Sequence, residues 1–126
     1  MNNMKHLPQI VCDVIKHKQQ RYNTAGDYLK IGKRWNLCVS RLEKPEYELA
    51  VLIHELYEFF TTDRDGIKEK DITKFDIESG HKDPGTLKGA PYHKQHMDAT
   101  KIERLVIRLL GEDWEEYDKS FEKLKY

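Results

Sequence analysis

Hydrophobic and polar positions divide the chain into a strand-forming first third and a helical remainder. Residues 10–15 form a short segment rich in β-branched side chains, which is typical of a strand. Residues 28–31 and 35–40 flank Gly32, and a glycine at a tight connection favours a hairpin. The apolar face of such a sheet must be covered by other elements. The pattern therefore predicts an α+β fold, with a small sheet of two to three strands covered by three to four helices.

The remaining two thirds of the chain show the spacing of apolar residues that is typical of helices. The first helix is expected to begin at Pro45, which suits a first helical turn, and to stop before Gly66. Further helices are expected around residues 69–78, from about 92 to 110, and over 113–124. A connection rich in glycine and proline, residues 79–91, precedes the third helix, and long connections of this kind are often functional.

Each of these helices carries apolar residues that are expected to face the core. In the second helix they are Ile72, Phe75 and Ile77, and in the fourth they are Trp114, Tyr117, Phe121 and Leu124. The stripe of the first helix comprises Leu49, Leu52, Ile53, Leu56, Phe59 and Phe60. The stripe of the third helix comprises Met97, Ile102, Leu105, Val106, Leu109 and Leu110. On the first helix the stripe is centred opposite Glu58, but Tyr47, Ala50 and Val51 share the face of His54 and Glu58. That second face is therefore expected to contact another part of the protein.

Length and charge restrict the classes of protein to which the chain can belong. A chain of 126 residues suits one domain with a single core. Lys and Arg total 22 and Asp and Glu total 22, so no net charge attracts nucleic acid or an anionic membrane. No signal peptide and no apolar run of membrane-spanning length is evident in the sequence. We expect one cytoplasmic domain that binds no nucleic acid and enters no membrane.

The two cysteines, Cys12 and Cys38, are not spaced as a pair of zinc ligands. Both lie among apolar or alternating neighbours, so each is expected to be a small buried hydrophobic residue on a strand. A disulfide between the two is not expected in the reducing cytosol.

The most informative motif is the run His54-Glu55-x-x-Glu58 within the first predicted helix. Residues four apart project from the same helical face, so His54 and Glu58 could bind one metal ion. Glu55 could then reach a water molecule beside that ion. The motif distantly resembles the H-E-x-x-H helix of the zincin-like zinc peptidases, with the second histidine replaced by a carboxylate.

A catalytic metal site usually has three protein ligands, so a third must come from another element. His96 is the preferred donor because it lies at the edge of the apolar stripe of the third helix, and His93 ranks second. Glu103 is expected to support a ligand or to form a salt bridge. Asp76 could orient a ligand histidine, although a helix cap or a surface charge suits it better.

Two histidines and one carboxylate form a ligand set that suits several divalent metals. Zinc is favoured for His54, Glu58 and His96, with iron or manganese as alternatives. With zinc, Glu55 would act as general base toward a metal-activated water, and the chemistry would be hydrolysis of a substrate that the sequence does not identify. In zincin-like proteins a strand at the sheet edge lies beside the metal helix, and residues 37–40 occupy the corresponding place in this sequence.

Other functions remain open or are disfavoured by the spacing. A calcium loop around Gly66 is excluded because Ile72 falls where a bidentate Glu is required. Glu55-x-x-Glu58 also resembles half of the magnesium site of nucleotide pyrophosphohydrolases, but the second carboxylate pair is missing. The main alternative is a non-enzymatic protein that binds a protein partner, with His54, Glu58 and His96 forming a polar network between helices.

Motifs spread over most of the chain resemble an uncharacterised family of small phage and prophage proteins. The matching residues are Arg21-Tyr22, Gly26-Asp27, His54-Glu55-x-x-Glu58, Gly66-Ile67, Phe75-Asp76, Asp83-Pro84-Gly85, Ala90-Pro91-Tyr92, His96, Ala99-Thr100, Glu103-Arg104 and Trp114 to Tyr117. The resemblance implies a phage or prophage protein in the cytoplasm of a bacterial host. It also favours His96 as the third ligand, because the family pattern places a histidine after Ala-Pro-Tyr. It implies no particular activity.

Overall fold

The computed structural model describes residues 4–126 and has the expected α+β fold. Three strands, β1 (Ile10–Ile15), β2 (Gly26–Ile31) and β3 (Arg34–Ser40), form one mixed sheet in the order β1-β3-β2. Four helices follow: α1 (Pro45–Arg64), α2 (Glu69–Ser79), α3 (His93–Leu109) and α4 (Trp114–Ser120). Short 3-10 turns occur at η1 (His17–Gln19), η2 (Pro84–Thr86) and η3 (Phe121–Lys123).

The sheet follows from the alternation of side chains along its central strand. In β3, Trp35, Leu37 and Val39 are buried against the helices, whereas the intervening residues are more exposed. Strand β1 runs parallel to β3 and β2 runs antiparallel to it. Gly32 adopts a φ of 64° in the tight turn of the β2–β3 hairpin, a conformation that few other residues tolerate.

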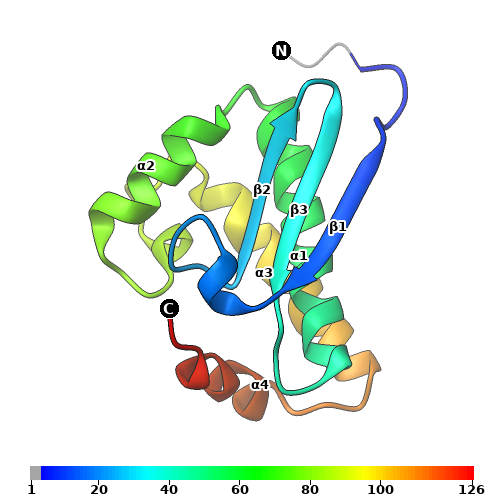
Figure 1. Cartoon of the computed structure of the whole chain (residues 1–126), viewed down its shortest axis with the longest axis vertical. Coiled ribbons are helices and arrows are strands. Elements are labelled where there is room, and N and C mark those ends of the chain that lie inside the picture. Colours follow the sequence, from blue (N-terminus) through cyan, green and yellow to red (C-terminus); the bar gives the residue numbers. More distant parts are fainter. Residues whose placement is uncertain (1–3) are drawn as a thin grey trace.

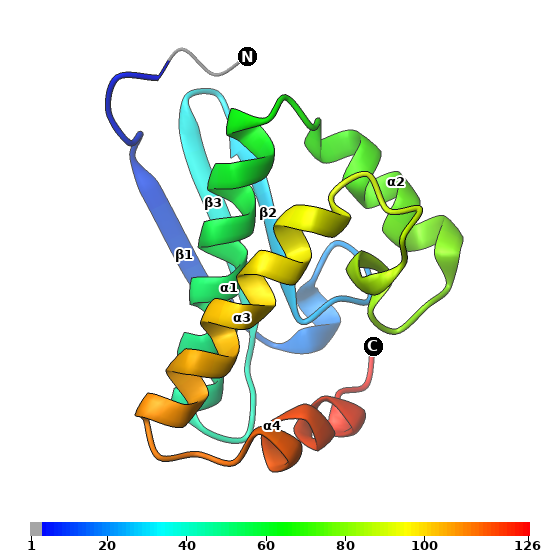
Figure 2. The same ribbon diagram turned by 180° about the vertical axis from the view of Figure 1, so that it is seen from behind.

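Helix α1 forms the middle layer of the protein. It packs on one face of the sheet, and α3 crosses its opposite side, as Figure 2 shows. The other face of the sheet is turned toward the viewer in Figure 1, and none of the helices in the described part of the chain covers it. Because α1 lies between two neighbours, both of its faces are buried, including the one that carries polar residues.

The predicted apolar stripe of α1 is therefore only partly correct. Phe59 is buried, but Leu49 is 42% exposed and the other four members are half-buried. The most buried positions instead include Tyr47, Ala50 and Val51. These share the face of His54 and Glu58, so the expected second contact of this face is confirmed, and α3 provides it.

The predicted stripe of α3 is wrong. Leu109 is 74% exposed, and Met97, Leu105 and Leu110 are also exposed. The buried residues of this helix are Gln95, His96, Ala99, Glu103 and Ile107. They recur at helical spacing on one face, which packs against the polar face of α1. The spacing of apolar residues therefore predicted the wrong buried face for α3, because most of the residues that this helix buries are polar.

Smaller expectations about the strands and α2 also need correction. Cys12 and Cys38 are free thiols, as expected, but they are half-buried rather than fully buried. Ile72 of α2 is buried, whereas Ile77 is exposed. Residues 37–40 belong to the central strand β3, which has neighbours on both sides, so the strand at the sheet edge next to the α1 site is β2. Within residues 4–126, every helix is too short or too polar to cross a membrane.

Candidate metal centre

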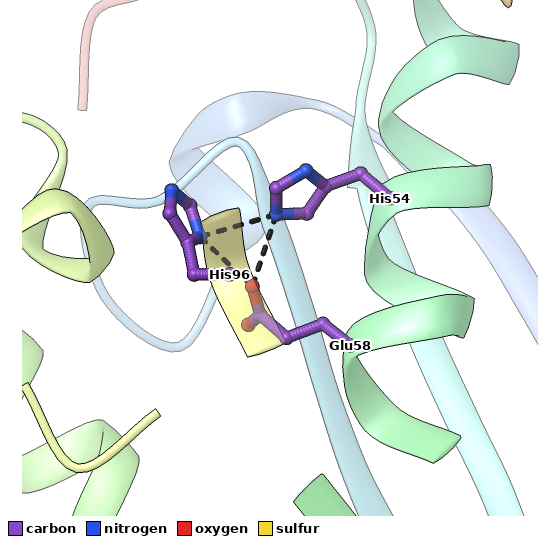
Figure 3. Close-up of side chains that lie close together, drawn as sticks. All are labelled: His54, Glu58 and His96. Carbon is purple, nitrogen blue, oxygen red and sulfur yellow. Dashed lines mark hydrogen bonds and ion pairs between the residues drawn. The ribbon is translucent and has the colours of Figure 1, made fainter. Parts of the chain in front are cut away.

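Three side chains from two helices meet in the interior of the protein (Figure 3). His54 and Glu58 project from successive turns of α1, and His96 reaches them from the first turns of α3. The Oε2 atom of Glu58 lies 3.0 Å from Nε2 of His54 and 2.8 Å from Nδ1 of His96. The two histidine nitrogens are 3.2 Å apart. All three residues are at least nine-tenths buried, so the sequence prediction that His96 rather than His93 approaches the motif is confirmed.

The separations between these three atoms suit a single metal ion. A triangle with these sides has a circumscribed radius of about 1.7 Å, which is shorter than the about 2.0–2.2 Å bonds that zinc forms with nitrogen and oxygen. One point above the plane of the triangle is therefore at bonding distance from all three atoms. The buried cluster could thus hold a metal ion.

The nitrogen of His54 that faces away from the cluster is held by a carboxylate. Its Nδ1 atom lies 2.7 Å from Oε1 of Glu103 on α3. The other oxygen of Glu103 accepts a short hydrogen bond from the hydroxyl of Tyr117, a fully buried residue of α4. This arrangement leaves Nε2 of His54 directed at the cluster, as carboxylate partners do for metal-bound histidines. It agrees with the supporting role that the sequence suggested for Glu103.

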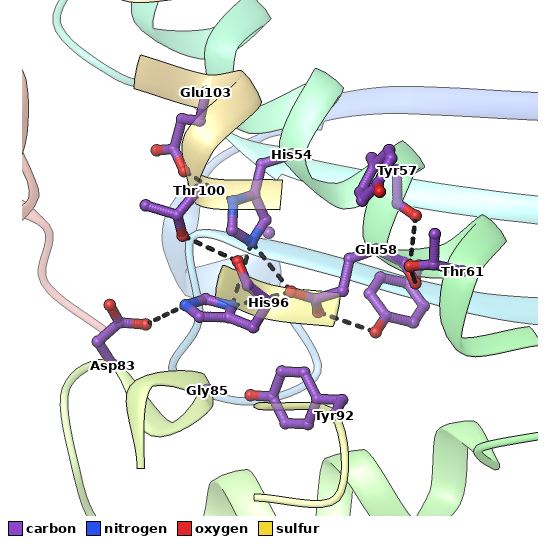
Figure 4. Close-up of polar contacts among 12 residues, drawn as sticks. His54, Tyr57, Glu58, Thr61, Asp83, Gly85, Tyr92, His96, Thr100 and Glu103 are labelled. Carbon is purple, nitrogen blue, oxygen red and sulfur yellow. Dashed lines mark hydrogen bonds and ion pairs between the residues drawn. The ribbon is translucent and has the colours of Figure 1, made fainter. Parts of the chain in front are cut away.

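Glu58 and His96 have outer partners as well (Figure 4). The hydroxyl of Tyr28 on β2 donates to Oε1 of Glu58 over 2.9 Å, which leaves Oε2 directed at the histidines. The Nε2 atom of His96 is 3.0 Å from Oδ1 of Asp83, which immediately precedes η2. Each of the three residues therefore has one donor atom in the cluster and another atom held from outside.

Two glycines make room for the polar side chains. A Cβ at Gly85 would lie 2.3 Å from Cγ of the His96 ring and 2.6 Å from its Nδ1 atom. A Cβ at Gly26 would lie 2.5 Å from both Cγ and Oε1 of Glu55. Contacts this short force one of the two groups to shift, so the observed positions of His96 and Glu55 depend on these glycines. Neither dependence could be inferred from the sequence, because both partners are distant along the chain.

The cluster also perturbs the pKa values of its members. Burial alone would lower the pKa of His96, but Asp83 and Glu58 outweigh it and raise that pKa to about 9. The pKa of His54 is raised well above its usual value, because Glu103 and Glu58 outweigh the effect of burial. Burial would raise the pKa of Glu58, but its hydrogen bonds to His54 and His96 lower it to about 2. Without an ion the histidines therefore hold protons that a metal would have to replace.

The cluster lies in the wall of a cleft of about 930 Å³ between the segment before β2, α1, the 80–92 connection and the C-terminal helices. Glu55 lines the same cleft and has no hydrogen-bond or ion-pair partner among residues 4–126. Burial raises its pKa well above the usual value, and the charge of Glu58 raises it further. A carboxylate that is free of partners beside the cluster is available for proton transfer.

Two residues have roles that differ from the sequence expectations. Asp76 does not contact the histidines; it accepts hydrogen bonds from the hydroxyls of Tyr22 and Tyr92, over 2.9 Å and 2.5 Å. The carboxylate beside His96 is instead that of Asp83, for which the sequence predicted no role. Asp83 belongs to the Asp-Pro-Gly run of the glycine- and proline-rich connection, which was the available signal for it.

His93 lies outside the cluster. Its Nδ1 atom donates a hydrogen bond of 3.0 Å to the carbonyl oxygen of Gly85, so it supports the turn that packs against His96.

Comparisons with models of protein families, with curated proteins and with solved structures found no match to this chain.

Proposed function

We propose that the protein is a metal-dependent hydrolase. In this proposal His54, Glu58 and His96 hold one divalent ion and Glu55 is the general base. The observation that carries it is the convergence of three buried donor atoms whose opposite sides are all held by other residues. Supporting partners of this kind position the ligands of metal sites and fix the histidine tautomers.

The donor set indicates which ions the site would accept. Two imidazoles and one carboxylate with an open side suit zinc, iron(II) or manganese(II), and zinc is our first choice. When bound, such an ion polarises a substrate carbonyl and acidifies water. The protein supplies the orientation of the ligands and the cleft that admits the substrate.

Glu55 is suited to accept and return a proton. It follows His54 directly in α1, lines the same cleft, and has a pKa that burial and the charge of Glu58 raise well above its usual value. A general base works best when its pKa is close to the pH of the reaction. The positive charge of a bound ion would lower the pKa of Glu55 and so favour the ionised form that accepts a proton.

Metal analysis of the purified full-length chain tests the proposal. We expect about one equivalent of zinc to bind, and binding to be lost in the His54→Ala, Glu58→Ala and His96→Ala variants. His6→Ala is the matched control, because this histidine is exposed and remote from the cluster. Glu55→Gln should retain zinc but lose hydrolysis of fluorescent casein. The absence of stoichiometric zinc, iron and manganese would overturn the proposal.

A second function is favoured by one feature of the same cluster. The three donor atoms already lie within hydrogen-bond distance of one another, so protons alone could hold them together. In that case the protein is a non-enzymatic accessory protein, in a phage or prophage setting as the sequence resemblance implies, and the cluster joins α1 to α3. The alanine variants would then unfold more readily, and no divalent ion would raise the melting temperature of the wild-type chain.

A further inference from the structure

Charge is distributed unevenly between the cleft and the rest of the protein. The whole chain is neutral, with 22 basic and 22 acidic residues. Of the residues that line the cleft, however, nine are Asp or Glu and only one, Lys82, is Lys or Arg. The cleft is therefore locally acidic, although the chain as a whole has no net charge.

Only part of this negative charge is neutralised from within the protein. Arg21 forms ion pairs with Asp27, at 2.7 Å, and with Glu69, at 2.8 Å. Glu58, Glu103 and Asp83 contact the two histidines of the cluster, and a divalent ion would add further positive charge there. These groups are accounted for without a substrate.

Four carboxylates of the cleft remain. Asp76 accepts hydrogen bonds from the hydroxyls of Tyr22 and Tyr92, and the other three have no partner within the described part of the chain. Glu55, Asp118 and Glu122 form no hydrogen bond and no ion pair among residues 4–126. Glu55 lies beside the cluster, while Asp118 and Glu122 lie on α4 and η3, one helical turn apart and exposed. Burial raises the pKa of Glu55, so Asp118 and Glu122 at the rim carry the negative charge that no group of the described residues offsets.

The surroundings of the rim suit a long cationic side chain. Phe121 lies between Asp118 and Glu122 in the sequence, lines the same cleft and is half-buried. An apolar surface beside carboxylates can cover the aliphatic stem of Lys or Arg while the charged end is paired. A phosphate group placed at this rim without a metal ion would be repelled by the two carboxylates.

The opposite wall of the cleft suits polypeptide. Strand β2 is paired with β3 on one side only, and residues 24–28 line the cleft. An edge strand offers main-chain groups with which an extended peptide can pair. An acidic rim and a strand edge therefore face the same space.

We propose that the cleft binds a basic polypeptide segment, with Lys or Arg side chains paired to Asp118 and Glu122 at its rim. This inference deepens the proposed function and rests on it, since the segment would be the substrate of the hydrolase. Asp118 and Glu122 are specificity residues, because they lie at the rim of the cleft and outside the metal cluster.

Binding of two matched fluorescent peptides to the full chain tests the inference. One peptide alternates Lys with Ala and the other alternates Glu with Ala, and fluorescence anisotropy is measured with and without one equivalent of zinc. We expect the Lys peptide to bind at least about tenfold more tightly than the Glu peptide, and to weaken when NaCl rises from about 50 to about 300 mM.

Paired variants separate the rim from general charge effects. Asp118→Asn/Glu122→Gln should weaken binding of the Lys peptide about five- to tenfold and leave zinc affinity unchanged. Glu115→Gln/Glu116→Gln makes the same change of charge on the same helix, outside the cleft, and should alter peptide affinity less than about twofold. Equal affinity for the two peptides, or equal losses in the two double variants, would overturn the inference.

The two proposals fail in different ways. If zinc binds and casein is hydrolysed but the two peptides bind equally, the basic substrate is wrong and the hydrolase stands. If the Lys peptide binds selectively at the rim but no metal binds, the hydrolase is wrong and the cationic preference of the cleft stands.

Discussion

The Nδ1 atom of His54 lies 2.7 Å from Oε1 of Glu103, a buried carboxylate that Tyr117 holds from its other side. Three helices therefore contribute to the position of one imidazole: α1 carries it, α3 carries the carboxylate, and α4 carries the phenol. A histidine placed in this way presents Nε2 to the cluster in one tautomer, which is what a metal ligand requires.

The first prediction concerns the strength of this support. Tyr117→Phe removes the hydroxyl donor and Glu103→Gln removes the charge that favours donation from Nδ1 of His54. We expect zinc affinity to fall about tenfold in Glu103→Gln, and less in Tyr117→Phe. Isothermal titration calorimetry measures both effects. Unchanged affinity in Glu103→Gln would mean that the carboxylate does not position the ligand.

The second prediction uses two glycines of the same connection. Gly85→Ala places a methyl group 2.3 Å from Cγ of the His96 ring, so the ring must move away from Glu58. We expect a loss of zinc affinity of at least about tenfold and a lower melting temperature of the loaded protein. Gly89→Ala is the control, because a Cβ there meets nothing within 4 Å. If both alanine variants bind zinc like the wild type, the packing of Gly85 does not define the site.

Sequence reasoning could identify the two candidate ligands on α1 because they lie one turn apart in a single helix. It found His96 from its place at the edge of an apolar stripe and from the family resemblance, although that stripe is not the buried face of α3. That stripe follows from the rule that buried positions of a helix are apolar. On α3 the buried positions His96 and Glu103 are polar, and departures of this kind from local rules are expected at functional sites.

The supporting residues were less accessible to prediction. Tyr28 donates a hydrogen bond to Glu58, which lies 30 residues away along the chain. Tyr117 donates one to Glu103, which lies 14 residues away. No spacing rule links such pairs, and both tyrosines also fit an apolar core. Gly85 and Gly26 were visible as turn or strand residues, but the close approach of a side chain to each depends on the packing of whole elements.

The third prediction separates the proposed base from the ligands. A Cβ at Gly26 would lie 2.5 Å from Oε1 of Glu55, so Gly26→Ala should rotate the Glu55 carboxylate away from its position. The far end of a Glu side chain moves at low cost, and we expect the fold and zinc affinity to be retained. Casein hydrolysis should fall about 10²-fold or more, as in Glu55→Gln. Full activity in Gly26→Ala would contradict the assignment of Glu55 as general base.

The fourth prediction concerns pH. The stability of the metal-free protein should fall as pH rises, whereas the stabilisation that zinc adds should increase. In the metal-free protein the pKa of His96 is raised from 6.5 to about 9, so its contribution to stability is complete below pH 6.5 and is lost as pH rises through about 9. We expect the free energy of unfolding to fall by about 3 kcal/mol across that range. Zinc must replace protons, so its stabilising effect should instead increase with pH.

Chemical denaturation at several pH values, with zinc and with a chelator, measures both trends. His96→Ala should make the decline of the metal-free protein between pH 6.5 and 9 smaller, and the raised pKa of His54 accounts for the decline that remains. His6→Ala, at an exposed position, should preserve the full decline. A polar network without metal predicts the same decline in both samples, because zinc would then add nothing at any pH. Divergence of the two curves above about pH 7 therefore distinguishes a metal centre from a network of protonated histidines.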